Sequence, residues 1–199
     1  MSAKRDLAAL GLRVKSGWAM AILLAGPSAA ARLVTRQRLE LTDPSVAGSS
    51  QPYHAVMGAA AADKRDVEAR LCQVVRDATS KALARMIAAA RDSAHEVHRI
   101  GLVVGSKIDP KRIANEHIRA HALEGQLFRT ALTEAAEAID LSSVILVERN
   151  AYADAAAILE RTEADVKANT AAFGRQQTGP WRADEKLAAL AAWVALANK

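Results

Sequence analysis

The strongest constraint on the fold is a pair of neighbouring stretches in which apolar side chains recur with period two. In the first stretch, 10–24, apolar residues occupy most even positions. Successive side chains of a strand point to opposite faces, so this spacing predicts a strand with one buried face. A Gly-Pro-Ser sequence at 26–28 is typical of a turn, and a second predicted strand, 32–41, follows it. We therefore expect an N-terminal β-hairpin.

One face of this predicted hairpin is basic. Arg32, Arg36 and Arg38 fall on even positions of the second strand, whereas its leucines fall on odd positions. The three arginines are therefore expected to share one face. Arg13 and Lys15, in the neighbouring strand, are expected to extend the basic surface. Arginine and lysine contacts to phosphate supply affinity without reading sequence, so this surface is the best candidate for contact with an anionic partner.

Helices and strands alternate along the rest of the chain. Apolar spacing predicts helices over 63–97, 109–139, 151–172 and 184–197, and short buried strands over 100–104 and 141–147. A long loop at 42–62 and a linker at 174–180 interrupt this pattern. Strands separated by helices imply parallel pairing with right-handed crossovers. We predict one α/β domain over 1–199, in which the hairpin and the parallel strands form a mixed sheet.

Composition restricts the function further. Aromatic residues make up only 4% of the chain, which favours closely packed helices over an aromatic-rich β-sandwich. The single cysteine, Cys72, excludes an internal disulfide and a cysteine-based zinc site, and we interpret it as a core residue. No stretch is apolar for long enough to cross a bilayer, so we expect a cytoplasmic protein without a membrane partner. The net charge of +5 modestly favours an anionic partner.

The element order, with its opening hairpin, resembles the ribonuclease H-like superfamily, and RuvC-type Holliday-junction resolvases look most similar within it. Such proteins have a first strand with an aliphatic run, a catalytic Asp, one residue and then Gly. In the matching stretch, 14–17, Gly17 fits and Lys15 stands in place of the Asp. The strand that would end in the family's next acid, 100–106, has no carboxylate there. The family's last helix carries two acids; here Asp184 and Glu185 begin it, and a second acid one turn on would fall at Leu187.

The resemblance implies a fold that acts on nucleic acid, and the missing acids imply that cleavage is lost. Two-metal cleavage of a phosphodiester needs several carboxylates that converge on the metal ions. A lysine at the centre of such a cluster, as Lys15 would be, repels metal but can hold a phosphate as a point charge.

Two further patterns are candidates for chemistry. His117 and His121 are four residues apart on one predicted helix face, with Glu124 three residues further on. This spacing suits a zinc site with a carboxylate as third ligand, although an exposed polar face gives the same pattern. The loop 105–107 ends a predicted strand and precedes a basic helix start, where free backbone N–H groups can bind phosphate. An ordinary strand-to-helix loop is the alternative.

Three functions remain open, and the sequence leaves undecided whether the chain is an enzyme. The first is a non-catalytic ribonuclease H-like module that binds nucleic acid or another polyanion; its contact residues are Arg13, Lys15, Arg32, Arg36, Arg38 and Lys107. The second is a scaffold or homo-oligomer in which the helix 185–197 packs between subunits. The third is a metal-dependent hydrolase or nuclease with Mg²⁺ or Mn²⁺ as cofactor; its candidate ligands are Asp184, Glu185, Glu148, His117 and His121. We favour them in that order.

Overall fold

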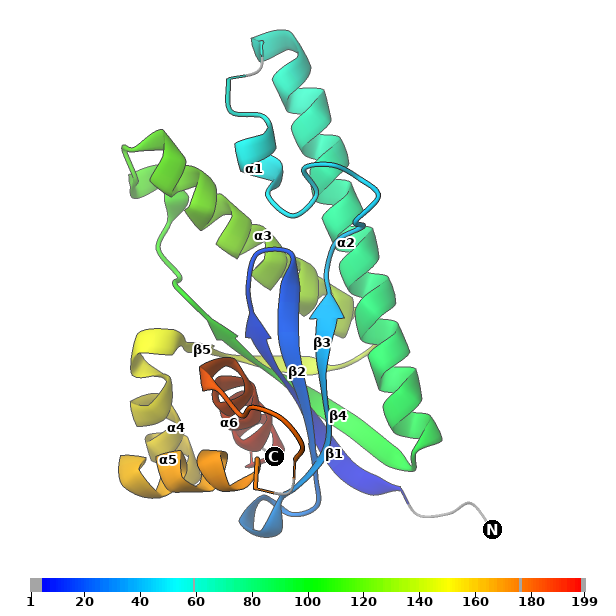
Figure 1. Ribbon diagram of the computed structural model, residues 1–199, viewed down its shortest axis with the longest axis vertical. Helices are drawn as coiled ribbons and strands as arrows, with labels where there is room; N and C mark the ends of the chain where they lie inside the picture. The colour runs from blue at the N-terminus through cyan, green and yellow to red at the C-terminus, as the bar shows by residue number, and fades with distance from the viewer. Residues whose placement is uncertain (1–4, 59, 176, 198–199) are drawn as a thin grey trace.

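The computed structural model describes residues 5–58, 60–175 and 177–197, and its centre is a five-stranded sheet in the order β3-β2-β1-β4-β5 (Figure 1). The first three strands pair antiparallel, and β1, β4 and β5 pair parallel. This confirms the predicted mixed α/β sheet with parallel later strands. The strands are β1 (Asp6–Val14), β2 (Trp18–Ala25), β3 (Arg32–Glu40), β4 (His95–Val104) and β5 (Ser142–Val147).

Helices cover both faces of the sheet. Figure 1 shows α2 and α3 on one side and α6, with α4 and α5, on the other. The described helices are α1 (Pro52–Ala55), α2 (Ala61–Asp92), α3 (Glu116–Glu137), α4 (Ala151–Leu159), α5 (Glu163–Ala172) and α6 (Ala183–Ala197), with three short 3₁₀ turns at Ser28–Ala30, Pro110–Arg112 and Glu148–Asn150. In the part of the chain that the structure describes, no helix is long and apolar enough to span a membrane.

The stretch predicted as one strand over 10–24 is two strands. A tight turn at 15–17 separates β1 from β2, closed by a hydrogen bond from the Lys15 N–H to the Trp18 carbonyl (2.9 Å). Gly17 has a φ of 85°, which favours glycine over any residue with a side chain. Both strands are central and covered by helices on both faces. Apolar residues therefore occur on both sides of the turn, and the hydrophobic pattern does not mark its position.

A β-bulge also changes the predicted basic face. The pairing of β2 with β3 shifts register at Leu24, where β3 holds one extra residue. Such an insertion reverses the alternation of side chains. Arg36 pairs with Ile22, which lies in the core under α6, whereas Arg32 pairs with Ala25, which lies in the core under α2 and α3. The prediction that Arg32 shares a face with the other two arginines is therefore wrong.

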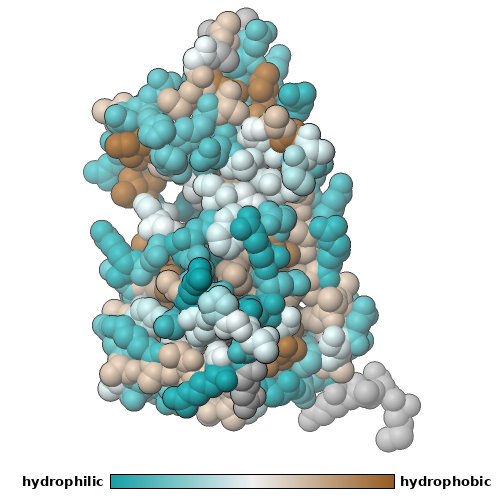
Figure 2. Space-filling model, in the orientation of Figure 1, coloured by the Kyte–Doolittle hydropathy of each residue, from teal (hydrophilic) through white to brown (hydrophobic). Residues whose placement is uncertain are grey.

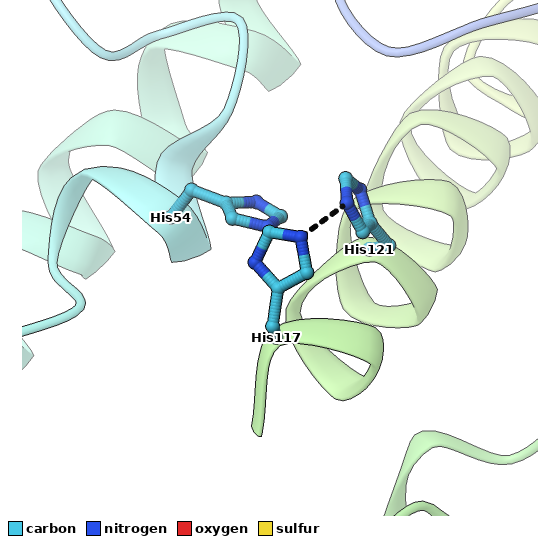
Figure 3. A group of neighbouring side chains, drawn as sticks. All are labelled: His54, His117 and His121. Atoms are coloured by element: carbon cyan, nitrogen blue, oxygen red, sulfur yellow. Dashed lines mark hydrogen bonds between the residues drawn. The ribbon is translucent and has the colours of Figure 1, made fainter. Parts of the chain in front are cut away.

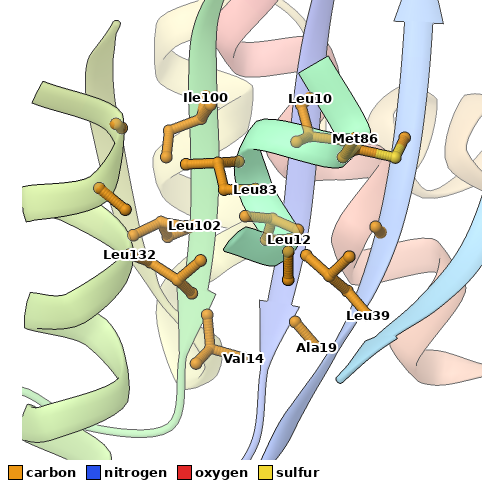
Figure 4. Close-up of a cluster of buried hydrophobic side chains, with 14 of the residues drawn as sticks. Leu10, Leu12, Val14, Ala19, Leu39, Leu83, Met86, Ile100, Leu102 and Leu132 are labelled. Carbon is orange, nitrogen blue, oxygen red and sulfur yellow. The ribbon is translucent and has the colours of Figure 1, made fainter. Parts of the chain in front are cut away.

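The core between the sheet and the α2–α3 layer follows the predicted periodicity (Figure 4). Alternate residues of β1 and β4 point toward these helices, and large aliphatic side chains of the helices pack against them. The labelled residues of this cluster include Leu10, Leu12, Ile100 and Leu102 from the strands and Leu83, Met86 and Leu132 from the helices.

The second core depends on two glycines. Gly11 and Gly101 pair across β1 and β4 and face α6. A Cβ atom on Gly11 would lie 1.9 Å from the Ala188 carbonyl oxygen, and one on Gly101 would lie 2.1 Å from the Ala191 carbonyl oxygen. The backbone of α6 therefore lies directly on the sheet. This close contact requires glycine in the strands and alanine in the helix.

This packing corrects the expected role of the last helix. The scaffold interpretation placed Leu187, Leu190 and Trp193 between subunits, but all three are buried within the chain. Figure 2 shows that apolar residues on the visible face lie in separate small groups among hydrophilic ones. The apolar face of α6 is therefore used to complete this chain's own core.

Several predicted helix boundaries move for local reasons. The helix predicted to reach 97 ends at Asp92, because Ala94 adopts a left-handed conformation (φ 61°) and starts β4 early. The helix predicted over 109–139 is a 3₁₀ turn followed by α3, whose start is capped by Asn115. The helix predicted over 151–172 breaks at Glu160, which has a φ of 52°. The loop 42–62 contains α1, and the linker 174–180 has no regular element in its described residues.

Candidate functional site

Charged residues gather at the carboxyl edge of the sheet. β1 and β4 run parallel as neighbours, so Lys15 and the loop 105–107 follow them at the same edge. Glu148 follows β5 there, and the first turn of α6 brings Asp184 to the same place. Open α/β sheets usually bind their ligands at this edge.

Arg13 lies at the centre of this group. It is only 4% exposed, on the face of β1 that α6 covers. Its guanidinium forms an ion pair with Glu148 and donates to the backbone carbonyls of Val14 (3.0 Å) and Val103 (3.4 Å). Its Nε lies 3.7 Å from Asp184 Oδ1, too far for a hydrogen bond. A buried guanidinium remains charged, so these acids are its counterions.

Lys15 adds a second cation. Its Nζ lies 3.1 Å from Asp184 Oδ1. The resemblance in sequence put Lys15 in place of a catalytic acid of the first strand. In the structure Lys15 lies in the turn after β1, and the strand residue that faces Asp184 of α6 is Arg13. The site thus places two cations, Arg13 and Lys15, against two carboxylates, Asp184 and Glu148. A divalent metal would have to displace both cations.

The third predicted carboxylate points elsewhere. Glu185 is buried, and its Oε2 accepts a hydrogen bond from the Arg182 N–H (3.0 Å), which caps the start of α6. Its Oε1 lies 4.0 Å from Arg36. Within the described ranges, Asp184, Glu185 and Glu148 form no common ligand set. The expectation that they share a metal therefore does not fit the geometry.

The arginines of β3 all have partners inside the chain. Arg36 donates to the carbonyls of Pro180 (2.8 Å) and Thr178 (3.2 Å), and so holds the linker before α6 against the sheet edge. The other two are about half exposed and lie in ion pairs, Arg32 with Asp6 and Arg38 with Glu40. Their predicted contact with nucleic acid stays a prediction.

A groove of about 390 Å³ lies beside the carboxyl edge, between the ends of β1 and β4 and the first half of α3. Arg13, Lys15, Ser106 and His121 are among its lining residues. The loop that carries Ser106 is held by Arg129, which donates to the Ser106 carbonyl (3.1 Å).

Exposed cations flank this groove. Lys107 is exposed, and its only polar contact in the described residues is a long one, 3.5 Å, to the Ile145 carbonyl. Lys111 and Arg112, in the 3₁₀ turn before α3, are exposed and form no ion pair within the described part of the chain. These side chains are therefore available to an anion.

The structure adds a third histidine to the predicted pair. His117 and His121 lie on one face of α3, with their Nε2 atoms 3.2 Å apart. His54 of α1 points at them, and its ring centroid lies 4.8 Å from that of His117 and 4.3 Å from that of His121 (Figure 3). The sequence reasoning missed His54 because it lies in the 42–62 loop, with no spacing signal to link it to α3.

Glu124 lies behind this histidine cluster. It is fully buried, and its Oε1 lies 2.7 Å from His54 Nδ1. Its Oε2 lies 3.8 Å from His121 Nδ1 and has no hydrogen bond, and His54 Nε2 is also buried without one. The predicted third ligand thus contacts a histidine ring from behind.

Cys72 is buried, as predicted, and it contacts Tyr53. Burial raises the pKa of the Cys72 thiol above its usual value, which keeps the thiol protonated and unreactive. Burial also raises the pKa of the Tyr53 hydroxyl, and the contact with Cys72 acts in the same direction. Neither group is a candidate nucleophile.

Comparison with known proteins identifies the fold. No family model matches the chain, and no curated protein matches its sequence. Among solved structures, it is similar to Thermus thermophilus RuvC (TM-score 0.52, 11% identity, covering 94% of this chain and 92% of that one). A structure of T. thermophilus RuvC in complex with a Holliday junction substrate gives a TM-score of 0.55 at 10% identity, covering 94% and 91% of the two chains. The yeast mitochondrial Holliday junction resolvase Ydc2 gives 0.51 at 11% identity, covering 95% and 78%. The chain therefore has a ribonuclease H-like fold with RuvC-type resolvases among its structural neighbours, as the resemblance in sequence order predicted.

Proposed function

We propose that this protein is a ribonuclease H-like module that binds nucleic acid at the carboxyl edge of its sheet and does not cleave it. The observation that carries the proposal is the ion-pair group at that edge, in which Arg13 and Lys15 neutralise Asp184 and Glu148. The same edge carries exposed cations around a groove.

The lack of cleavage follows from charge. Two-metal cleavage needs carboxylates that are free to bind cations and that converge on one point. Here Asp184 and Glu148 each have a cationic partner, and Glu185 is turned toward Arg182 and Arg36. Metal binding at this edge would leave the buried Arg13 without counterions, which is energetically costly.

Binding follows from the cations that remain available. Lys107, Lys111 and Arg112 lie beyond the end of β4, next to the groove. Contacts of this kind hold the phosphate backbone without selecting a base sequence. The Holliday junction substrate bound to T. thermophilus RuvC supports a nucleic acid as the partner. We also expect the protein to act in the cytoplasm, since its one thiol is free and buried.

The test is a binding titration with labelled duplex, single-stranded and four-way-junction DNA and with matching RNA, at low and moderate salt and with and without Mn²⁺. Three phosphate contacts, from Lys107, Lys111 and Arg112, predict that log K falls against log salt with a slope of about −3 on duplex DNA. No cleavage is expected in any arm. Absence of binding to every nucleic acid, or cleavage with Mn²⁺, would contradict the proposal.

A matched pair of variants locates the surface. Lys107→Glu should weaken binding by about tenfold or more and reduce the salt slope by about one, because it removes one phosphate contact and adds repulsion. Lys167→Glu makes the same charge change on α5, where Lys167 pairs with Glu163. Equal losses in both variants would mean that only net charge matters and that the carboxyl edge is not the binding surface.

A further inference from the structure

The histidine cluster has no part in the function proposed above. We propose that His54, His117 and His121 bind one zinc ion, which fastens α1 to the start of α3. In the part of the chain that the structure describes, these three residues form the only group of three metal-ligating side chains whose ligand atoms all lie within 4.8 Å of one another. They come from two segments that are far apart in sequence and that meet only through the fold (Figure 3).

The distances suit a zinc ion. Two imidazole nitrogens at about 2.0–2.1 Å from a tetrahedral zinc are about 3.3 Å from each other. The Nε2 atoms of His117 and His121 are 3.2 Å apart. Both rings come from one helix face at a spacing of four residues, so they approach the ion together. The third histidine is close as well, since one ligand atom of each of the three rings lies within 4.8 Å of the others.

His54 is held in the orientation that such a site needs. Its Nδ1 lies 2.7 Å from Oε1 of Glu124, which is fully buried and can accept a hydrogen bond from an N–H at that nitrogen. A proton on Nδ1 leaves the lone pair of the opposite nitrogen, Nε2, free to bind a metal, and Nε2 is buried without a hydrogen-bond partner. A metal-ligating histidine commonly donates its other N–H to a carboxylate, which fixes its tautomer and orientation. A buried, unpaired nitrogen is otherwise costly, and a metal ion would remove that cost.

The donor set selects the kind of metal. Neutral imidazoles bind zinc well, whereas Mg²⁺ and Mn²⁺ prefer oxygen ligands, Mg²⁺ in octahedral geometry. His117 and His121 are exposed, so a water molecule can fill the fourth position. The carboxylate of Glu124 lies behind His54, and it would balance part of the ion's charge from the interior.

The consequence for the fold is local. α1 has only four residues and belongs to the long segment between β3 and α2. Pro52 of this helix is buried, and Tyr53 packs against the apolar core. Zinc would add a direct link from this segment to α3, next to the groove that His121 lines. Cleavage by chymotrypsin at Tyr53 should therefore slow when zinc is bound.

The experiment is a zinc titration of the full chain by calorimetry, with thermal unfolding followed in parallel and Mg²⁺ as a second arm. We expect one zinc ion per chain and a higher melting temperature with zinc but not with Mg²⁺. His117→Gln and His121→Gln, both at exposed positions, should each weaken zinc binding at least tenfold without loss of fold. His98→Gln, which removes a histidine outside the cluster, should keep the zinc-dependent shift.

A fourth variant tests the orienting carboxylate. Glu124→Gln should keep all three ligands and weaken zinc binding by about 10–100-fold. Absence of zinc binding at one equivalent, or binding that survives both exposed variants unchanged, would overturn the site. His54→Gln would complete the set, and the two exposed variants decide the result even if it fails to fold. The titration contains no nucleic acid, so its result is independent of the binding function proposed above.

Discussion

Arg13 occupies the last position of β1 that faces α6, and its charge reaches carboxylates from two other elements. Its guanidinium cannot lose its proton at physiological pH, so the fold must supply counterions within the protein. Glu148, directly after β5, and Asp184, in the first turn of α6, do so. One buried side chain thus connects three elements and neutralises acidic charge at the carboxyl edge of the sheet.

Replacing this side chain should cost stability. Arg13→Ala removes two backbone hydrogen bonds and both ion pairs, so Glu148 loses its cationic partner and Asp184 keeps Lys15 alone. The acids are partly exposed, so we expect the free energy of unfolding to fall by about 2–3 kcal/mol, below the range for a fully buried pair. Urea unfolding measures the change. Arg149→Ala, at an exposed neighbouring position, is the control and should change stability by less than about 0.5 kcal/mol; equal values would show that the Arg13 pairs contribute nothing.

Tyr53 and Cys72 give the protein a dependence on alkaline pH. Their pKa values are raised in the folded state, chiefly by burial, so the folded chain keeps protons that the unfolded chain releases. The stability from these groups is present below their ordinary pKa values, 10.0 for Tyr53 and 9.0 for Cys72, and is lost as the pH rises above them. The melting temperature should therefore fall between about pH 8 and pH 11, and less steeply in Tyr53→Phe. Parallel curves for the two proteins would show that the hydroxyl does not contribute.

At the scale of elements, the contact of α6 with the sheet sets the tightest requirement on sequence. Gly101→Ala would place a methyl group 2.1 Å from the Ala191 carbonyl oxygen, so the helix must move away from β4. We expect a loss of more than about 3 kcal/mol in the free energy of unfolding, or no folded protein. Gly125→Ala is the control, because nothing lies within 4 Å of its added methyl group on α3. That variant should gain about 0.5–1 kcal/mol through helix propensity, and a similar gain in Gly101→Ala would refute the close contact.

The sequence predicted these elements well where one physical signal dominated. The stripe along α2 and the apolar runs of β4 and β5 were identified because burial on a fixed side imposes a period. The turn at 15–17 was missed because β1 and β2 are buried on both faces, so no alternation marks its position. The bulge in β3 was missed because its extra residue depends on the pairing with β2, which the sequence of β3 alone does not contain.

The candidate site was predictable in part for the same reason. The positions of Lys107 and Glu148 at one edge follow from the parallel pairing of the strands before them, which the sequence predicted. Lys15 reaches the same edge through the missed turn at 15–17. Arg13 is buried because α6 lies over β1. This depends on tertiary packing, which the local sequence pattern does not contain. His54 joins α3 only through the path of the 42–62 segment. The spacing in the sequence therefore predicted two histidines of the cluster, and only the structure identified the third.

At the scale of the whole molecule, the carboxyl edge and the histidine cluster differ in how they would bind a metal ion. The carboxyl edge holds acids that already have Arg13 and Lys15 as partners, whereas the histidine cluster offers three imidazole rings as metal ligands. Both border the same groove, which His121 and Lys15 line. A protein with this arrangement should bind zinc in preference to Mg²⁺ or Mn²⁺.

This distinction gives a prediction for the intact protein. Millimolar Mg²⁺ or Mn²⁺ should leave the melting temperature unchanged, because binding stabilises a fold only when the free cation exceeds its dissociation constant, and the paired acids at the edge keep that constant high. Arg13→Asp combined with Lys15→Ser removes both competing cations and adds a carboxylate between Asp184 and Glu148. If this double variant folds, differential scanning calorimetry should detect stabilisation by Mn²⁺ that the wild-type protein lacks. A Mn²⁺-dependent rise already present in the wild-type protein would show that Arg13 and Lys15 do not block the edge, and the argument against metal-dependent cleavage would fail with it.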